Sequence, residues 1–221
     1  PAGVERFGAL TVRFFPVDAD RNPSAFLHAQ QRISGGGPVS PETEAAWLRH
    51  SVHSQPLLDH LRAQEHAIDR VVAGPYLFGV TYRAALLHPR KTLLVPCLHD
   101  EPFARLALMR PLFEGVAGVL FNSEPERDFA RRLFSLPAAR SHVVGMGIEP
   151  FEADGADIIA RRGLRAPYLM YAGRRETGKG TPMLCDYLAA FRARTGRDVR
   201  LVLAGSGPVE APSELLPHIL D

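Results

Sequence analysis

Short apolar runs alternate with amphipathic stretches between residues 69 and 148, and this alternation constrains the fold more than any other feature. The apolar runs have the length and composition of buried strands, and the stretches between them have helical spacing. Strands are predicted at 69–76, 91–100, 118–123 and 141–148, and helices at 79–87, 103–116 and 123–134. Continuous apolar strands that alternate with helices are typical of a parallel sheet covered on both faces. The sequence therefore predicts an α/β domain.

The same pattern begins again nearer the carboxyl end of the chain. A strand is predicted at 168–173, a helix at 181–194 that Gly196 terminates, and a second strand at 199–205. The preceding segment, 149–167, has no strand pattern and is interpreted as a connection.

Two domains are therefore expected, residues 1–149 and 168–221, joined by a linker at 150–167. Two strands and one helix are too little for a stable sheet. The second domain is expected to be incomplete in this chain.

The N-terminal region is less regular. A strand is predicted at 9–17, and residues 18–41, with three consecutive glycines, are predicted to form a mobile loop. A helix is then predicted with Ser40 as its N-cap and Pro41 in its first turn, followed after Pro56 by a second helix at 57–66.

Composition argues against several classes of protein. A net charge of +2 disfavours a general nucleic-acid-binding protein. No apolar run approaches the roughly 18 residues of a membrane span, and no signal segment directs export. Cys97 and Cys185 are expected to be free thiols. No metal site is predicted, because no metal-ligand spacing connects the histidines His28, His50, His53, His60, His66, His88 and His142.

The segment "GRRETGKG", residues 173–180, joins a predicted strand to a predicted helix and has two interpretations. Gly173, Gly178 and Lys179 have the spacing of a P-loop, but Gly180 stands where that loop needs Ser or Thr, and the strand at 199–205 lacks a terminal Asp. Alternatively, Arg174 and Lys179 are two cations that hold a diphosphate without a metal. On spacing alone, a solvated basic loop fits equally well.

The segments "YLMYAGRRETGKG" and "LVLAGSGP" resemble the start of the donor domain in retaining glycosyltransferases of the GT-B fold, glycosyltransferase family 4. In the first half, "VPCLHDE", "LFNSEPERD" and "VVGMGIEPF" resemble segments of the same family, as does the short "AGVERF" near the start. The resemblance implies a GT-B architecture with two Rossmann-like domains.

The resemblance also implies roles for individual residues. Arg174 and Lys179 would bind the diphosphate of a nucleotide sugar, and Gly173 would let the backbone approach the phosphates. His99 would contact the donor sugar, with Asp100 beside it to position the acceptor or the histidine. The remaining candidates would border the nucleotide and are Gly205, Ser206 and Gly207.

The residues themselves also allow structural roles for several of these positions. His99 and Asp100 lie at a strand end, where polar residues are common. Ser123 is predicted to cap a helix, with Glu126 completing a capping box. Glu124 and Glu126 are interpreted as stabilising the helix dipole.

The activity implied is metal-independent transfer of a sugar, with retention, from a nucleoside diphosphate to a glycan or lipid-linked acceptor in polysaccharide biosynthesis. No cofactor and no nucleic acid would take part, and the protein would work in the cytoplasm, with association at the inner face of the membrane left open. The family's paired glutamates are absent from this chain and are expected after Asp221. Alternatives are a non-catalytic sugar-nucleotide or partner-binding module, and an epimerase or phosphorylase on the same fold.

Overall fold

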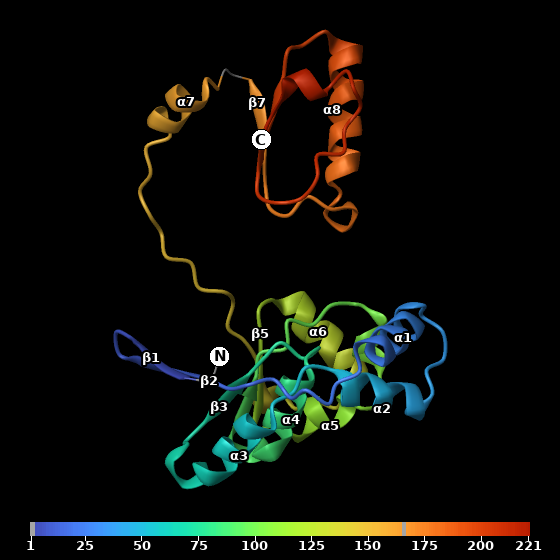
Figure 1. Ribbon diagram of the computed structural model, residues 1–221, viewed down its shortest axis with the longest axis vertical. Helices are drawn as coiled ribbons and strands as arrows, with labels where there is room; N and C mark the ends of the chain where they lie inside the picture. The colour runs from blue at the N-terminus through green and yellow to red at the C-terminus, as the bar shows by residue number, and fades with distance from the viewer. Residues whose placement is uncertain (1–2, 165–166) are drawn as a thin grey trace. The chain divides into compact units, whose positions relative to one another are not determined.

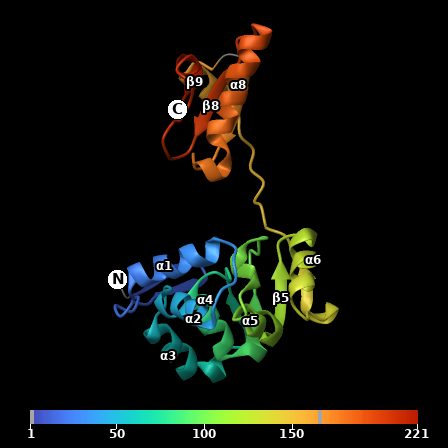
Figure 2. The same ribbon diagram turned by 90° about the vertical axis from the view of Figure 1, so that its right-hand side faces the viewer.

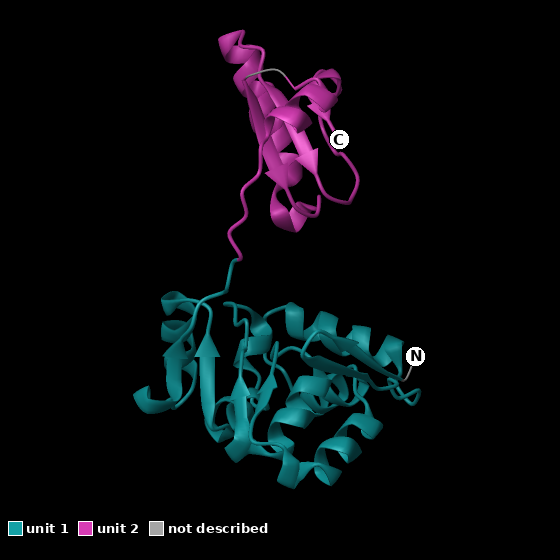
Figure 3. Cartoon of the chain, turned by 90° about the vertical axis from the view of Figure 1, so that its left-hand side faces the viewer, with its two compact units in different colours: residues 1–148 teal, residues 149–221 magenta. Residues whose placement is uncertain are grey.

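The computed structural model describes residues 3–164 and 167–221. The chain divides into two compact units, Pro1–Ile148 and Glu149–Asp221 (Figure 3). Each unit contains a parallel sheet connected by helices, so the predicted α/β fold class is confirmed. Ala2 of the "AGVERF" segment and Arg165 and Ala166 of the expected linker lie outside the described residues.

The first unit is built on a four-stranded parallel sheet with the order β3-β4-β5-β6 (Figure 1). The strands lie within the four predicted ranges but are shorter, and helices follow the first three of them. Their bounds are β3 Val71–Ala73, α4 Gly79–Leu87, β4 Thr92–Leu94, α5 Met109–Gly115, β5 Gly118–Phe121, α6 Glu124–Leu133 and β6 Ser141–Val143. The strand predicted at 91–100 ends at Leu94, and Cys97, further along the predicted range, has a φ of 52°, which is not an extended conformation.

Aromatic and aliphatic side chains fill the core of this unit between the sheet and its helices. Tyr76, Phe113 and Phe121 are fully buried, as is Leu94 of β4. Phe113 stacks on Phe134 with ring centroids 4.2 Å apart. This core fixes the positions at which the strands end, and the loops that carry the predicted site residues follow those ends.

The prediction of a loop at residues 18–41 is wrong for the 12 residues Pro23–Ser34, which form helix α1. Asn22 caps the helix by accepting a hydrogen bond from the Ala25 amide at 3.0 Å. Ala29 and Ile33, four residues apart, are buried on one face. The three consecutive glycines favour a loop, but they lie after the helix. The prediction did not use the helical spacing of apolar residues that precedes them.

Helices α2 (Pro41–His50) and α3 (Gln55–Ala63) complete the helical part of the first unit. Ser40 caps α2 and Pro41 lies in its first turn, as predicted. Helix α3 begins two residues earlier than predicted because Ser54 caps it and Pro56 is accommodated in its first turn.

A separate antiparallel hairpin, β1 (Gly3–Phe7) and β2 (Leu10–Phe14), precedes the helices. The strand predicted at 9–17 is confirmed within β2, whereas β1 was not predicted. Gly8, with a φ of 59°, permits the tight turn between the two strands.

The second unit contains a parallel sheet with the order β7-β8-β9 and a long helix packed against it (Figure 2). The predicted strands and helix are confirmed, and Gly196 ends the helix in a left-handed conformation with a φ of 65°. The elements are α7 Ala156–Arg162, β7 Tyr168–Ala172, α8 Thr181–Thr195, β8 Arg200–Ala204 and β9 Ile219–Leu220. No helix within the described ranges has the length and apolarity needed to cross a membrane.

The expectation of only two strands in this unit is wrong, because β9 pairs with β8 at Leu201 and Ile219. Strand β9 has only two residues, too few for the period-two pattern from which strands are predicted. A core of apolar side chains lies between the sheet and α8, comprising Cys185, Leu188, Val199, Leu201, Leu203 and Leu215.

Candidate functional site

Two glycine-containing loops follow β7 and β8 and lie against each other at the carboxyl edge of the sheet. The Gly173 amide donates to the Ala204 carbonyl at 2.8 Å, and the Arg175 amide donates to the Ser206 carbonyl at 2.7 Å. Neighbouring parallel strands end at the same edge, which is where open α/β sheets bind ligands. The predicted residues Gly173, Gly205, Ser206 and Gly207 are therefore brought together in one place.

The glycines in these loops are required by the distance between the two backbones. Gly205 has a φ of 140°, and a Cβ atom there would lie 2.0 Å from the Gly173 carbonyl oxygen. Gly207 has a φ of 113°, and a Cβ there would lie 2.4 Å from the Arg175 carbonyl oxygen. A side chain at either position would force the two loops apart.

Arg175 holds the two loops together from inside. Its side chain is only 7% exposed, its Nε donates to the Gly207 carbonyl at 2.8 Å, and its Nη1 donates to Asp221 Oδ1 at 2.7 Å. The sequence predicts a phosphate contact for the neighbouring Arg174. Its pattern does not indicate that Arg175 is buried and Arg174 exposed.

Arg174 and Lys179, the two predicted phosphate-binding cations, are exposed at this edge. The Arg174 side chain is 72% exposed, and its Nη2 lies 3.6 Å from Glu176 Oε1. Lys179 ends the 3₁₀ turn Thr177–Lys179 directly before α8 and forms no ion pair within residues 3–164 and 167–221. Both positive charges are therefore accessible to an anion.

The amino end of α8 lies beside Lys179 and has no side-chain cap. Its N-cap is Gly180, with a φ of 72°. First-turn amides of a helix are free to bind an anion when no side chain satisfies them. Thr181 Oγ1 donates to the Glu176 carbonyl at 3.2 Å, so this hydroxyl is part of the turn rather than a metal ligand of the P-loop type.

The other predicted residues, His99 and Asp100, lie in the first unit after β4. Together with Asn122 and Ser123 they line a cavity of about 560 Å³ next to the ends of β4 and β5. Both side chains are exposed, and Asp100 Oδ1 accepts from Arg105 Nη2 at 2.6 Å. The cavity therefore presents an imidazole and a paired carboxylate to solvent.

Glu126 lies in the first turn of α6, as the helix-dipole interpretation requires, but its carboxylate does not complete the predicted capping box. Ser123 Oγ accepts from the Glu126 amide at 3.3 Å, so the serine half of the capping box is confirmed. The Glu126 carboxylate instead accepts from the Leu98 amide at 2.6 Å and from the Asn122 amide at 2.7 Å, and the residue is 8% exposed. It ties the loop after β4 to the end of β5, a role that depends on tertiary contacts.

A second contact fastens the same loop at Glu101. The Tyr76 hydroxyl donates to Glu101 Oε1 at 2.7 Å. Burial raises the pKa of Tyr76, and the hydrogen bond to Glu101 raises it further. His99 and Asp100 thus lie between two anchored positions, Leu98 and Glu101. The arrangement holds the backbone of the loop while leaving both side chains exposed.

Comparison with known proteins gives one informative similarity. The chain is 34% identical over 158 residues to the alpha-D-kanosaminyltransferase of Streptomyces kanamyceticus, an alignment that covers 68% of this chain and 40% of that protein. The chain thus spans less than half the length of this curated relative. No protein-family model and no solved structure matches the chain. The similarity supports the general class of glycosyltransferase.

Proposed function

We propose that this chain is part of a glycosyltransferase that moves a hexosyl group from a nucleoside diphosphate to an acceptor, with retention and without a metal ion. The observation that carries the proposal is the pair of interlocked glycine loops with Arg174 and Lys179 beside an uncapped helix end. The 34% identity to a kanosaminyltransferase supports the general activity.

In this proposal the anionic diphosphate is stabilised by fixed positive charge. The acceptor hydroxyl oxygen bonds to the anomeric carbon, the bond from that carbon to the diphosphate breaks, and the hydroxyl proton passes to the departing phosphate oxygen. Negative charge therefore grows on the diphosphate in the transition state. Arg174, Lys179 and the first amides of α8 would stabilise it there, where electrostatic stabilisation contributes most to rate.

The nucleotide would lie along the second glycine loop. Gly205, Ser206 and Gly207 would border it, because this loop lies at the carboxyl edge of the sheet, where open α/β sheets bind ligands. Arg175 would not contact the nucleotide, since its guanidinium is already bound to Gly207 and Asp221. Its role would be to keep the loop in place.

For the first unit we propose that His99 contacts the donor sugar and that Asp100 positions either the acceptor or the histidine. The cavity of about 560 Å³ beside them is large enough for a sugar-sized group. The acceptor we propose is a glycan or a lipid-linked sugar in cytoplasmic polysaccharide biosynthesis.

The diphosphate contact is tested by calorimetry with UDP, GDP and ADP. Each of the variants Arg174→Ala and Lys179→Ala removes a charged hydrogen bond worth about 1.5–3 kcal/mol, so affinity for the preferred nucleotide should fall by roughly 10- to 150-fold. Arg197→Ala, an exposed arginine after the opposite end of α8, is the control and should bind as the wild type does.

Two results would refute the proposal. One is that none of the three nucleotides binds the wild type. The other is that both loop variants keep wild-type affinity, which would leave Arg174 and Lys179 as solvated surface charges.

A further inference from the structure

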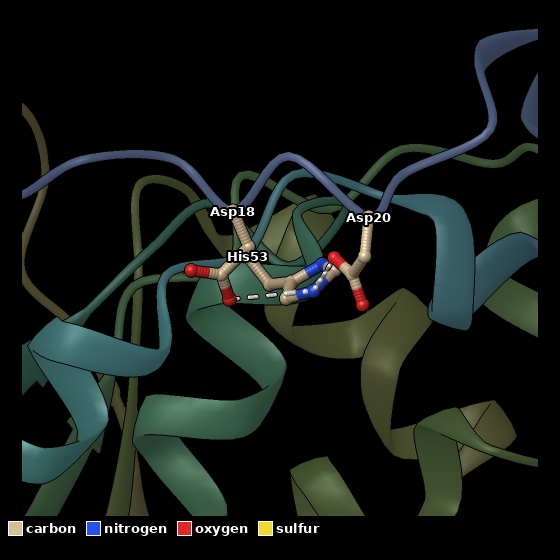
Figure 4. Close-up of side chains that lie close together, drawn as sticks. All are labelled: Asp18, Asp20 and His53. Atoms are coloured by element: carbon tan, nitrogen blue, oxygen red, sulfur yellow. Dashed lines mark ion pairs between the residues drawn. The ribbon is translucent and has the colours of Figure 1, made fainter.

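Asp18, Asp20 and His53 converge in the first unit, outside the glycine loops and outside the His99 cavity (Figure 4). The two aspartates lie between β2 and α1, and the histidine lies in the turn between α2 and α3. His53 Nε2 is 3.4 Å from Asp18 Oδ2 and 3.2 Å from Asp20 Oδ1. Three potential ligand atoms therefore lie within 4.8 Å of one another.

The orientation of the imidazole is set by a backbone carbonyl outside the cluster. His53 Nδ1 lies 2.9 Å from the Ser51 oxygen, which can only accept, so Nδ1 carries the proton. In the neutral ring, Nε2 is then an acceptor that faces two further acceptors. Metal-bound histidines commonly donate their second ring nitrogen to a carbonyl in this way.

Hydrogen bonds from the backbone and from side chains hold the two segments together, in addition to the contacts among the three side chains of the cluster. The Asp18 amide donates to the His53 carbonyl at 3.1 Å, and Arg21 Nε donates to the His50 carbonyl at 3.3 Å. The Gln55 amide donates to Asp18 Oδ2 at 2.8 Å. Gly79, the first residue of α4, donates to Ser51 Oγ at 2.9 Å, which fixes the turn that carries His53. The cluster is therefore pre-organised by the fold.

The geometry and charge of the cluster favour a particular kind of cation. A tetrahedral ion with ligands at about 2.0–2.1 Å has ligand-to-ligand distances of about 3.3–3.4 Å, close to the two distances above. The three side chains line a cavity of about 530 Å³, together with Arg49 and Arg83. Calcium and magnesium depend on all-oxygen ligands of high charge, whereas an imidazole nitrogen suits zinc and similar metals.

We propose that Asp18, Asp20 and His53 bind a divalent transition metal such as Zn²⁺, with three protein ligands and a fourth position open to the cavity. Arg83, which lines that cavity, has a buried Nε without an acceptor among the described residues, and a water or anion bound to the metal at the open fourth position would supply one, whereas the cation itself would not. The ion would fasten the connection between β2 and α1 to the turn between α2 and α3. The site takes no part in the proposed transfer chemistry.

The alternative to a metal ion between these side chains is a proton on His53 Nε2. A doubly protonated His53 would bridge the two carboxylates as an ion pair and would leave no ligand atom for a metal. The two occupants are distinguished by direct measurement of metal binding to the whole chain.

Binding of Zn²⁺ is measured by calorimetry and by thermal unfolding with and without ZnCl₂. The wild type should bind one Zn²⁺ per chain at this site and should unfold at a higher temperature when it is present. Asp20→Asn is the main variant because this side chain is 78% exposed, so the substitution is expected to leave the fold intact. Even outer-shell changes lower metal affinity about 10- to 100-fold, so losing a ligand should weaken binding by at least about tenfold.

Asp69→Asn, an exposed aspartate of the same unit, is the matched control and should bind as the wild type does. His53→Asn should abolish binding at this site. The proposal is overturned if the wild type shows no zinc binding, or if Asp20→Asn and His53→Asn both retain wild-type affinity. A wild type that binds no zinc but is destabilised by Asp20→Asn would identify the protonated histidine as the occupant.

Discussion

Replacement of Glu126 by alanine tests whether this residue joins two loops or only favours a helix end. The carboxylate accepts hydrogen bonds from the Leu98 and Asn122 amides at 2.6 and 2.7 Å in a site that is 8% exposed. A hydrogen bond to a charged group contributes about 1.5–3 kcal/mol. Loss of both, with two amides left without acceptors, should lower the free energy of unfolding of the first unit by roughly 3–6 kcal/mol.

Trp47 allows this loss to be measured in the first unit alone. It is the only tryptophan in the chain, and it is buried in the core of that unit with 3% exposure. Its fluorescence during urea or thermal unfolding therefore follows the first unit. For a unit of this size the expected loss corresponds to a fall in Tm of roughly 6–24 °C. Glu126→Gln, which keeps one acceptor oxygen, should lose about half as much.

Glu124→Ala is the matched control, because Glu124 lies in the same first turn of α6 but is exposed. Its loss removes only the interaction with the helix dipole, about 0.3–1 kcal/mol. If Glu124→Ala and Glu126→Ala destabilise the first unit equally, and by less than about 1 kcal/mol, the helix-dipole interpretation is right and the role assigned to Glu126 here is wrong.

Two further predictions concern the second unit. Gly205→Ala should separate the glycine loops, because its Cβ would lie 2.0 Å from the Gly173 oxygen. Nucleotide affinity, measured by calorimetry, should then be lost. The circular dichroism spectrum should stay that of the wild type, because β7 and β8 remain folded. The hydrogen bond from Arg192 holds the pKa of Asp198 below its ordinary value of about 3.8. The stability that the Arg192–Asp198 pair contributes is therefore present above pH 3.8 and is lost as the pH falls through the lowered pKa of Asp198. The difference in unfolding temperature between the wild type and Asp198→Asn should vanish in acid. A difference that does not change with pH would contradict this prediction.

The parts of the fold that were predictable from sequence are those encoded by local patterns. Helix α8 has Pro182 in its first turn and Gly196 after its last, and both signals act through backbone geometry that does not depend on the rest of the chain. The strands of the first sheet were located because they are apolar throughout. Strand β9 was missed because its two residues carry no periodicity.

The candidate sites were predictable only where their residues lie in one segment. The loop at 173–180 brings its glycines and cations together in eight consecutive residues. Asp18 and His53 are 35 positions apart, and they meet only because the turn after α2 packs against the connection before α1. No spacing rule can connect them, so the sequence predicts no metal site at His53.

The adjacent arginines Arg174 and Arg175 divide two tasks that the sequence could not separate. For Arg175 to bind a phosphate, its guanidinium would have to leave the Gly207 carbonyl and Asp221, and the second glycine loop would lose the contacts that hold it beside the first. The Arg175 guanidinium is buried and Asp221 is 51% exposed. Arg175 would therefore lose a buried hydrogen bond to Gly207 and a partly exposed ion pair in exchange for one phosphate contact of about 1.5–3 kcal/mol. Arg174 is 72% exposed, and its contact of 3.6 Å between Nη2 and Glu176 Oε1 is also exposed. Exposed ion pairs contribute only about 0–1 kcal/mol. The buried Arg175 therefore keeps the loops in place, and the exposed Arg174 is the one that we propose binds the diphosphate.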